Sequence, residues 1–282
     1  MKLGTALRLG RVSNLPTVWT NTLAGAVLAG AGGFGAEFAL VLLAFSLFYT
    51  GGMFLNDAFD APFDAVHRPE RPIPSREIGA REVFACGYGM MALGTVVLAW
   101  FGIAPALAGL TLAVAITFYD WHHKMNVFGP VVMGLCRVLV YVGAGLCFTL
   151  ALPPALWIGA ALMLCYLIGL TYIAKQENLG KVENLWPLLF LAAPVAYGAW
   201  LAASQAVVGG FWLLFTGWML VALWYLRRRR KGDIPRAVVS LIAGISLLDA
   251  LLIAGTGAPA LAILALAGFG VTLLFQRYIA GT

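Results

Sequence analysis

Residues 38–64 read FALVLLAFSLFYTGGMFLNDAFDAPFD, and no charged residue precedes Asn56 in this stretch. An α-helix needs about 20 mostly apolar residues to cross a bilayer, and the apolar part comes close to that length. Asn56, Asp57, Asp60 and Asp64 follow it directly. A carboxylate costs about 2.5–3.5 kcal/mol at the centre of a membrane and less near its surface. We therefore expect a transmembrane helix that ends in a polar cluster held together by a cation.

The spacing of these four side chains favours one ligand set. On a helix Asn56, Asp60 and Asp64 lie along one stripe, with Asp57 at its border. Pro62 is expected to distort or end this helix, which would place Asp64 on the turn beyond it. Oxygen ligands suit Mg²⁺, which proteins hold through one or two carboxylates plus substrate phosphates. We interpret all four as metal ligands; the alternative is a solvated acidic loop or a set of helix caps.

The composition extends the membrane assignment to the whole chain. Of its 282 residues, 62% are hydrophobic and 11% charged, whereas about a quarter of the residues of a soluble domain are charged. Spans of this length must be helices, because lipid-exposed backbone needs internal hydrogen bonds. The prediction is an all-α, polytopic transmembrane helical bundle, a single domain over residues 1–282. Its ten apolar stretches lie near 15–33, 38–58, 82–101, 104–121, 128–149, 154–173, 185–203, 208–226, 236–254 and 259–277.

Basic residues alternate from one connection to the next. They precede the first expected span and follow every even-numbered one, whereas the connections after odd-numbered spans hold no Lys or Arg. Lys and Arg collect in cytoplasmic loops, near anionic lipid. We therefore attribute the net charge of +6 to topology, and expect no nucleic-acid partner. The expected location is a bacterial plasma membrane, with both termini cytoplasmic.

The motif of residues 56–64, NDxxDxxxD, matches the signature of the UbiA-type intramembrane prenyltransferases. Residues 67–75, HRPERPIPS, resemble the family's NRPIPSG segment, and residues 11–17, RVSNLPT, are similar to its N-terminal element. The resemblance implies about nine helices around a central cavity that opens to lipid, so nine to ten spans are expected. It also implies Mg²⁺-dependent transfer of an isoprenoid group from a prenyl diphosphate to an aromatic or other lipophilic acceptor.

Two charged residues lie inside expected spans. Arg137 is in the fifth, where an ionisable residue is a functional-site hypothesis by default, and its guanidinium matches phosphate geometry. We expect it to contact diphosphate or to pair with a carboxylate of the acidic cluster; the alternative is a structural ion pair between helices. For Asp249, in the ninth span, we favour a cavity-facing hydrogen bond to a neighbouring Ser or Thr over catalysis.

Residues 119–124, YDWHHK, end the fourth span and are similar to the family's Tyr-x-x-x-Lys element, with Tyr and Lys one residue further apart. A Lys at a cavity mouth can neutralise phosphate, and an Asp can orient an acceptor or hold a second metal. The resemblance and these properties together give the expected site. Its catalytic residues are Asp60, Asp64, Asp120 and Lys124, and its diphosphate-binding residues are Asn14, Asn56, Arg68, Tyr119, Arg137 and Lys181.

The loop after the sixth span departs from the family pattern. UbiA-type enzymes carry a second acidic motif there, DxxxD, which binds further Mg²⁺, but residues 172–183 read YIAKQENLGKVE. Glu177, with Asn178 or Glu183, still offers oxygen ligands, so we predict Glu177 as a further metal ligand. The missing aspartates indicate a divergent member and leave one or two metals open.

These parts suggest a mechanism. Mg²⁺ and nearby cations, Arg137 among them, would offset the charge that grows on the diphosphate as the allylic C–O bond breaks. Aromatic faces of Tyr119, Trp121 or Tyr141 would stabilise the carbocation. A transporter or non-catalytic lipid-binding protein, and a terpene cyclase of the same fold, are the alternatives. Neither the acceptor nor the prenyl chain length can be read from the sequence.

Overall fold

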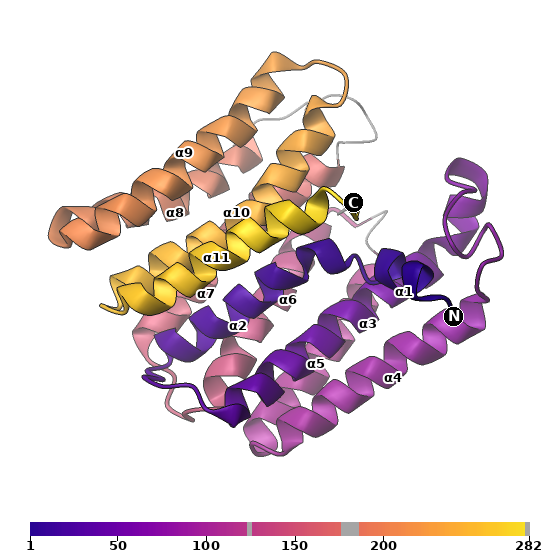
Figure 1. Ribbon diagram of the computed structural model, residues 1–282, viewed down its shortest axis with the longest axis horizontal. Coiled ribbons are helices and arrows are strands. Elements are labelled where there is room, and N and C mark those ends of the chain that lie inside the picture. Colours follow the sequence, from indigo (N-terminus) through magenta and orange to yellow (C-terminus); the bar gives the residue numbers. More distant parts are fainter. Residues whose placement is uncertain (123–125, 176–185, 280–282) are drawn as a thin grey trace.

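Every regular element that the computed structural model describes, over residues 1–122, 126–175 and 186–279, is a helix. Their order along the chain is visible in Figure 1. The elements are α1 (Leu3–Leu9), η1 (Val12–Asn14), α2 (Leu15–Leu28), α3 (Ala36–His67), α4 (Ala80–Ala99), α5 (Ile103–His122), α6 (Gly129–Leu146), α7 (Pro154–Lys175), η3 (Trp186–Leu188), α8 (Leu189–Ser204), α9 (Ala206–Arg228), α10 (Asp233–Gly255) and α11 (Pro259–Gln276).

Among the described residues, nine helices are long and apolar enough to cross a membrane: α3 to α7, η3 with α8, and α9 to α11. Each expected span from the second onward corresponds to one of them. The first, 15–33, corresponds to α2, which has 14 residues and falls short of the roughly 17 that a span requires. The all-α bundle of nine to ten spans is confirmed, and the first of the ten apolar stretches is the one that forms no full-length span among the described residues.

Helix α2 stops early at a glycine turn. Gly30 has a φ of +96°, which glycine adopts without steric cost. Its N–H donates to the Val27 carbonyl at 2.9 Å, and the Ala31 N–H donates to the Ala26 carbonyl at 3.0 Å. These two bonds form a Schellman motif, a common way to end a helix.

Although short, α2 runs through the middle of the bundle. It packs against α3, α6, α7, α10 and α11. Figure 1 shows the N and C labels at the same end of the bundle, and there the Gln276 amide donates to Asn14 Oδ1 at 3.1 Å. The end of α11 therefore lies against the start of α2.

Helix α10 is the most enclosed span. In its most apolar stretch 83% of the residues are buried, compared with 17% in α11. A helix that is apolar on all sides belongs in the interior, and α10 packs against α2, α7, α8, α9 and α11. In Figure 1, α4 and α9 lie at opposite edges of the bundle.

Helix α3 carries the acidic motif beyond the apolar zone. Its 32 residues make it roughly 48 Å long, more than the ~30 Å of a bilayer's hydrocarbon core. It continues through Pro62 to His67. Of the two effects expected of Pro62, distorting or ending the helix, the ending is therefore wrong. Proline lacks one N–H, and losing a single hydrogen bond near a helix end is tolerable. Asp64 consequently stays on α3 with Asn56 and Asp60.

Candidate active site

A cavity of about 1250 Å³ lies among α2, α3, α5, α6, α7 and α10. Charged side chains from the acidic motif and the neighbouring loops line its mouth. Two to three helical turns before Asn56, the α3 residues Phe45 and Phe48 line it instead, facing Leu112 of α5 and Val140 of α6. One continuous space therefore has a charged mouth and an apolar interior, which suits a ligand with an anionic head and a hydrocarbon tail.

The structure brings the expected site residues together. All nine that it describes line this one cavity: Asn14, Asn56, Asp57, Asp60, Asp64, Arg68, Tyr119, Asp120 and Arg137. The other three, Lys124, Glu177 and Lys181, lie outside the described residues.

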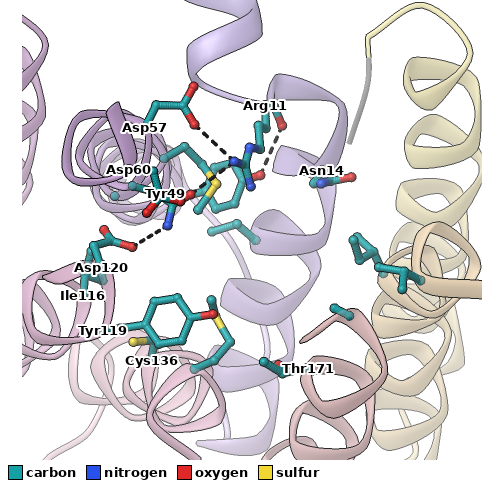
Figure 2. A pocket seen from close by; sticks show the side chains of 18 of the residues that line it. Arg11, Asn14, Tyr49, Asp57, Asp60, Ile116, Tyr119, Asp120, Cys136 and Thr171 are labelled. Atoms are coloured by element: carbon teal, nitrogen blue, oxygen red, sulfur yellow. Dashed lines mark hydrogen bonds and ion pairs between the residues drawn. The ribbon is translucent and has the colours of Figure 1, made fainter. Parts of the chain in front are cut away.

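Arg11 joins the N-terminal segment to the acidic motif, as Figure 2 shows. Its Nη2 donates to Asn56 Oδ1 and to Asp57 Oδ1, each at 3.1 Å. Its backbone is left-handed, with φ of 41°, an uncommon conformation that for a non-glycine residue costs of order 1 kcal/mol. The carbonyl of this strained residue accepts the Tyr49 hydroxyl at 3.1 Å.

Arg71, from the loop after α3, meets the same carboxylate. Its Nη1 lies 3.2 Å from Asp57 Oδ1, so two guanidinium groups neutralise Asp57. Sequence reasoning quoted both arginines within motifs and assigned neither to the site. For Arg71 the available signal was its position shortly after the acidic motif, whereas Arg11 lies far from that motif in the sequence.

Asn56 links two charges. Its Oδ1 accepts from Arg11, and its Nδ2 donates to Asp120 Oδ1 at 3.0 Å. Asp120 is only 4% exposed and reaches this bond from α5. We call Arg11–Asn56–Asp120 the mouth bridge.

A second arrangement of the same kind lies deeper. Arg137 Nη1 donates to Asn21 Oδ1 at 2.7 Å, and Asn21 Nδ2 donates to both Asp249 oxygens, at 3.0 and 2.8 Å. The Tyr141 hydroxyl also donates to Asp249. We call Arg137–Asn21–Asp249 the interior bridge.

The interior bridge bears on one of the two contacts expected for Arg137. The pairing with an acidic-cluster carboxylate is wrong, whereas contact with diphosphate stays a prediction. This residue also donates to Thr17 Oγ1 at 3.2 Å, so its hydrogen bonds go to α2 and not to the acidic cluster. Sequence reasoning missed Asn21, because an uncharged polar residue in an apolar helix reveals no partner.

The expectation for Asp249 is right in naming a Thr partner, Thr20, but wrong in placing the carboxylate at the cavity. Asp249 is fully buried and does not line the cavity, so its hydrogen bonds do not face that space. Asn21 and Tyr141 donate to its carboxylate, and Thr20 of α2 interacts with it as well. The side chain therefore serves the contact between α10 and its neighbours α2 and α6.

The oxygen ligands at the mouth bear on the expected metal. Within the described residues, no three His, Cys, Asp or Glu side chains are grouped so as to hold an ion by themselves. The carboxylates of Asp60 and Asp64 and the amide of Asn56 nevertheless line the same mouth. This set fits an ion that takes its remaining ligands from a diphosphate, as Mg²⁺ typically does.

Comparison with known proteins agrees with the fold. Residues 18–238 match the model of the UbiA prenyltransferase family. Over 213 residues the chain is 31% identical to digeranylgeranylglyceryl phosphate synthase of Methanopyrus kandleri, which covers 72% of this chain and 73% of the relative. The protein of the same name from Metallosphaera sedula is 31% identical over 113 residues, 40% of each chain.

Solved structures show the same architecture. A structure described as concerning digeranylgeranylglyceryl phosphate synthase in membranes has a TM-score of 0.66 at 17% identity, covering 90% of this chain and 98% of that one. A UbiA homolog from Archaeoglobus fulgidus, bound to GPP and Mg²⁺, has a TM-score of 0.56 at 15% identity, covering 97% and 99%. At these identities the likeness supports the fold alone.

The organisms of the relatives bear on location. An integral, multi-pass protein is consistent with the nine apolar helices found among the described residues. The expectation of a bacterial plasma membrane has no support, because the named relatives are mostly archaeal. The expected cytoplasmic location of both termini has no support either.

Proposed function

Because the chain belongs to the UbiA prenyltransferase family, we propose that it transfers an isoprenoid group from a prenyl diphosphate to a small acceptor within the membrane, with Mg²⁺ as cofactor. The observation that carries the proposal is the single cavity with a charged mouth and an apolar interior. A prenyl diphosphate has the same two parts. Family membership also favours an enzyme over the transporter alternative.

Asp60, Asp64 and Asn56 would hold the metal. Mg²⁺, when bound, would offset the negative charge of the diphosphate as it leaves. Asp57 is paired with Arg11 and Arg71, so we assign it to holding those arginines at the mouth. Glu177 remains a predicted ligand outside the described residues.

Arginine would supply the remaining positive charge. Arg68 and Arg137 both line the cavity, and a guanidinium offers several donors in the planar geometry that phosphate oxygens accept. Donors already in place where charge develops stabilise the transition state without reorganisation. Arg137, fixed to α2 by two hydrogen bonds, meets that requirement.

The apolar interior would take the prenyl tail and keep water from the carbocation. Among the three aromatic residues expected to face it, Tyr119 lines the cavity. Tyr141 instead bonds Asp249, and Trp121 is 69% exposed. Tyr49 lines the cavity too, with its ring 5.9 Å from the Arg137 guanidinium carbon.

For the acceptor, we favour a glyceryl phosphate type over an aromatic one. The support is the name of the relatives, whose product is a glyceryl phosphate with two geranylgeranyl groups. Arg8 and Lys175 also line the cavity, so the wall has further cations for a second phosphate. Asp120, which also lines the cavity, would orient the acceptor hydroxyl.

The test is to incubate the purified protein in nanodiscs with prenyl diphosphates of several lengths, with and without Mg²⁺ and a prenylated glyceryl phosphate. Diphosphate release and products are followed by mass spectrometry. We expect an ether product that requires both Mg²⁺ and the acceptor. A cyclised hydrocarbon formed without acceptor would identify a terpene cyclase, and no release from any prenyl diphosphate would refute the proposal.

A further inference from the structure

We propose that Asn21 and Asp249 are positioning residues, which hold the Arg137 guanidinium in the orientation that receives the diphosphate. The inference rests on the proposed function, because it gives Arg137 that ligand. It explains a fully buried carboxylate in α10, the most enclosed helix, that does not itself line the cavity.

The bonding pattern of Asn21 leaves its amide one orientation. Arginine has only donors and a carboxylate only acceptors, so Oδ1 must face Arg137 and Nδ2 must face Asp249. The three hydrogen bonds measure 2.7, 3.0 and 2.8 Å. Asn21 thereby couples the two charged groups, although they do not bond each other directly.

Charge explains why the third member is an aspartate. An arginine at membrane depth needs a compensating group, and the interior bridge supplies one without bringing a carboxylate to the cavity wall. A carboxylate exposed there would repel the diphosphate. Asp249 can serve because Asn21 and Tyr141 satisfy its oxygens in a fully buried position.

Helices α2 and α10 are also joined by a hydrogen bond between two uncharged side chains. One residue earlier on α2, Thr20 Oγ1 donates to Ser246 Oγ of α10 at 3.1 Å. Both residues are buried and uncharged, and Ser246 bonds neither Arg137 nor Asn21. This pair joins the same two helices at the same depth. Thr20 also interacts with Asp249, so Ser246→Ala is a control for packing beside the bridge that leaves Arg137, Asn21 and Asp249 themselves unchanged.

The surrounding backbone keeps the bridge in place. A Cβ on Gly25 of α2 would lie 2.6 Å from the Tyr141 carbonyl oxygen of α6, so the two backbones touch one turn beyond Asn21. Arg137 and Tyr141, both on α6, are thus held against α2. The guanidinium is fixed further by Thr17 and by the Tyr49 ring at 5.9 Å.

The first test compares Asn21→Ala and Asp249→Asn with the control Ser246→Ala. Diphosphate release from geranyl diphosphate, with Mg²⁺ and a prenylated glyceryl phosphate as acceptor, gives kcat/KM, and a melting curve gives Tm. We expect kcat/KM to fall at least tenfold in both bridge variants and to stay within twofold of wild type in Ser246→Ala. Equal losses of kcat/KM in all three variants would mean that the bridge residues serve only helix packing, and would overturn the inference.

A second measurement separates positioning from stability. In an Arg137→Lys background there is no guanidinium to orient, so adding Asn21→Ala should cost less than twofold in kcat/KM. A tenfold loss in that background as well would mean that Asn21 acts independently of Arg137, and would contradict the proposal.

A charge swap guards against variants that fail to fold. In the double variant Asn21→Asp with Asp249→Asn, the carboxylate moves to position 21, where it can accept from Arg137 and from the new amide at position 249. The links of the bridge and the net charge therefore persist. We expect this double variant to recover kcat/KM to within fivefold of wild type, whereas Asp249→Asn alone does not recover. No rescue would overturn the inference, and a wild-type protein that releases no diphosphate would refute the proposed function and this inference with it.

Discussion

The mouth bridge and the interior bridge use the same chemistry at different depths of one cavity. In each, an asparagine accepts from an arginine and donates to an aspartate. They differ in what surrounds them. At the mouth, Arg11 divides its donors between Asn56 and Asp57, and Arg71 shares Asp57. In the interior, Asn21 and Asp249 are fully buried.

This difference indicates two tasks. Groups at the mouth have alternative partners, so a metal and a diphosphate can enter by exchanging hydrogen bonds at low cost. In the interior, the fully buried Asn21 and Asp249 lack water to replace a lost partner, and breaking a buried charged hydrogen bond is expensive. Substrate should therefore rearrange the mouth bridge and leave the interior bridge unchanged.

The largest effect should come from the carboxylates of the mouth. We expect Asp60→Ala with Asp64→Ala to lower prenyl diphosphate turnover by about 10³-fold, because the metal loses two of its three proposed protein ligands. Tm should change little, since removing two like charges relieves repulsion. Asp233→Asn is the control: that aspartate pairs with Arg228 outside the cavity and should not affect kcat. Unaltered turnover in the double variant would exclude the mouth as the metal site.

In the interior, we expect a substitution at the contact between α2 and α6 to lower thermal stability. Gly25→Ala forces a Cβ to within 2.6 Å of the Tyr141 carbonyl oxygen, and such overpacking costs about 1–3 kcal/mol. Gly209→Ala, whose Cβ would meet nothing within 4 Å, is the matched control and should not lower Tm. Equal melting temperatures for the two variants would show that α2 and α6 are not held rigidly at this contact.

A smaller effect on activity is expected at the mouth, where Arg11 and Arg71 both pair with Asp57. Arg71→Ala leaves Asp57 paired with Arg11, so kcat/KM should fall about fivefold, equivalent to about 1 kcal/mol for a partly exposed ion pair. Arg236→Ala removes an exposed pairing with Asp233 and serves as the control. A hundredfold loss of kcat/KM in Arg71→Ala would show that Arg11 does not share its role.

The smallest effect is expected at the outer rim, where Thr5 and Arg8 of α1 donate to Glu77. The hydrogen bond from Arg8, followed by that from Thr5, lowers the pKa of Glu77. A lowered pKa in the folded state stabilises the fold at neutral pH, and the stabilisation is lost as pH falls through that pKa. Glu77→Gln should therefore lower Tm slightly at pH 7, with a difference that disappears in acid. A difference independent of pH would contradict this origin.

The sequence predicted the parts of the molecule in which a charge conflicts with its surroundings. Asp60 and Arg137 stood out because ionisable groups in apolar helices need a reason to be there, and both line the cavity. Helix α3 was predicted to be distorted or to end at Pro62, but one missing N–H did not end it. The first expected span, 15–33, ends earlier than predicted, at the turn of Gly30. A hydropathy pattern does not reveal such a turn.

The unpredicted parts depend on contacts between distant segments. Asn21 and Asp249 are 228 residues apart, and only the packing of α2 against α10 makes them partners. Arg11 resembled an ordinary basic residue before a span, because its approach to Asn56 requires the left-handed backbone turn between α1 and η1. Neither relationship has a local pattern from which it could be read.

The central claim is that a diphosphate enters at the mouth and meets Arg137 while the interior bridge stays closed. A structure of the protein with geranyl thiolodiphosphate and Mn²⁺, located by anomalous scattering, tests it most directly. We predict the metal beside Asp60 and Asp64, the diphosphate in contact with Arg137, and the Arg137–Asn21–Asp249 hydrogen bonds retained. A diphosphate bound away from Arg137, or a metal absent from the two aspartates, would contradict the account.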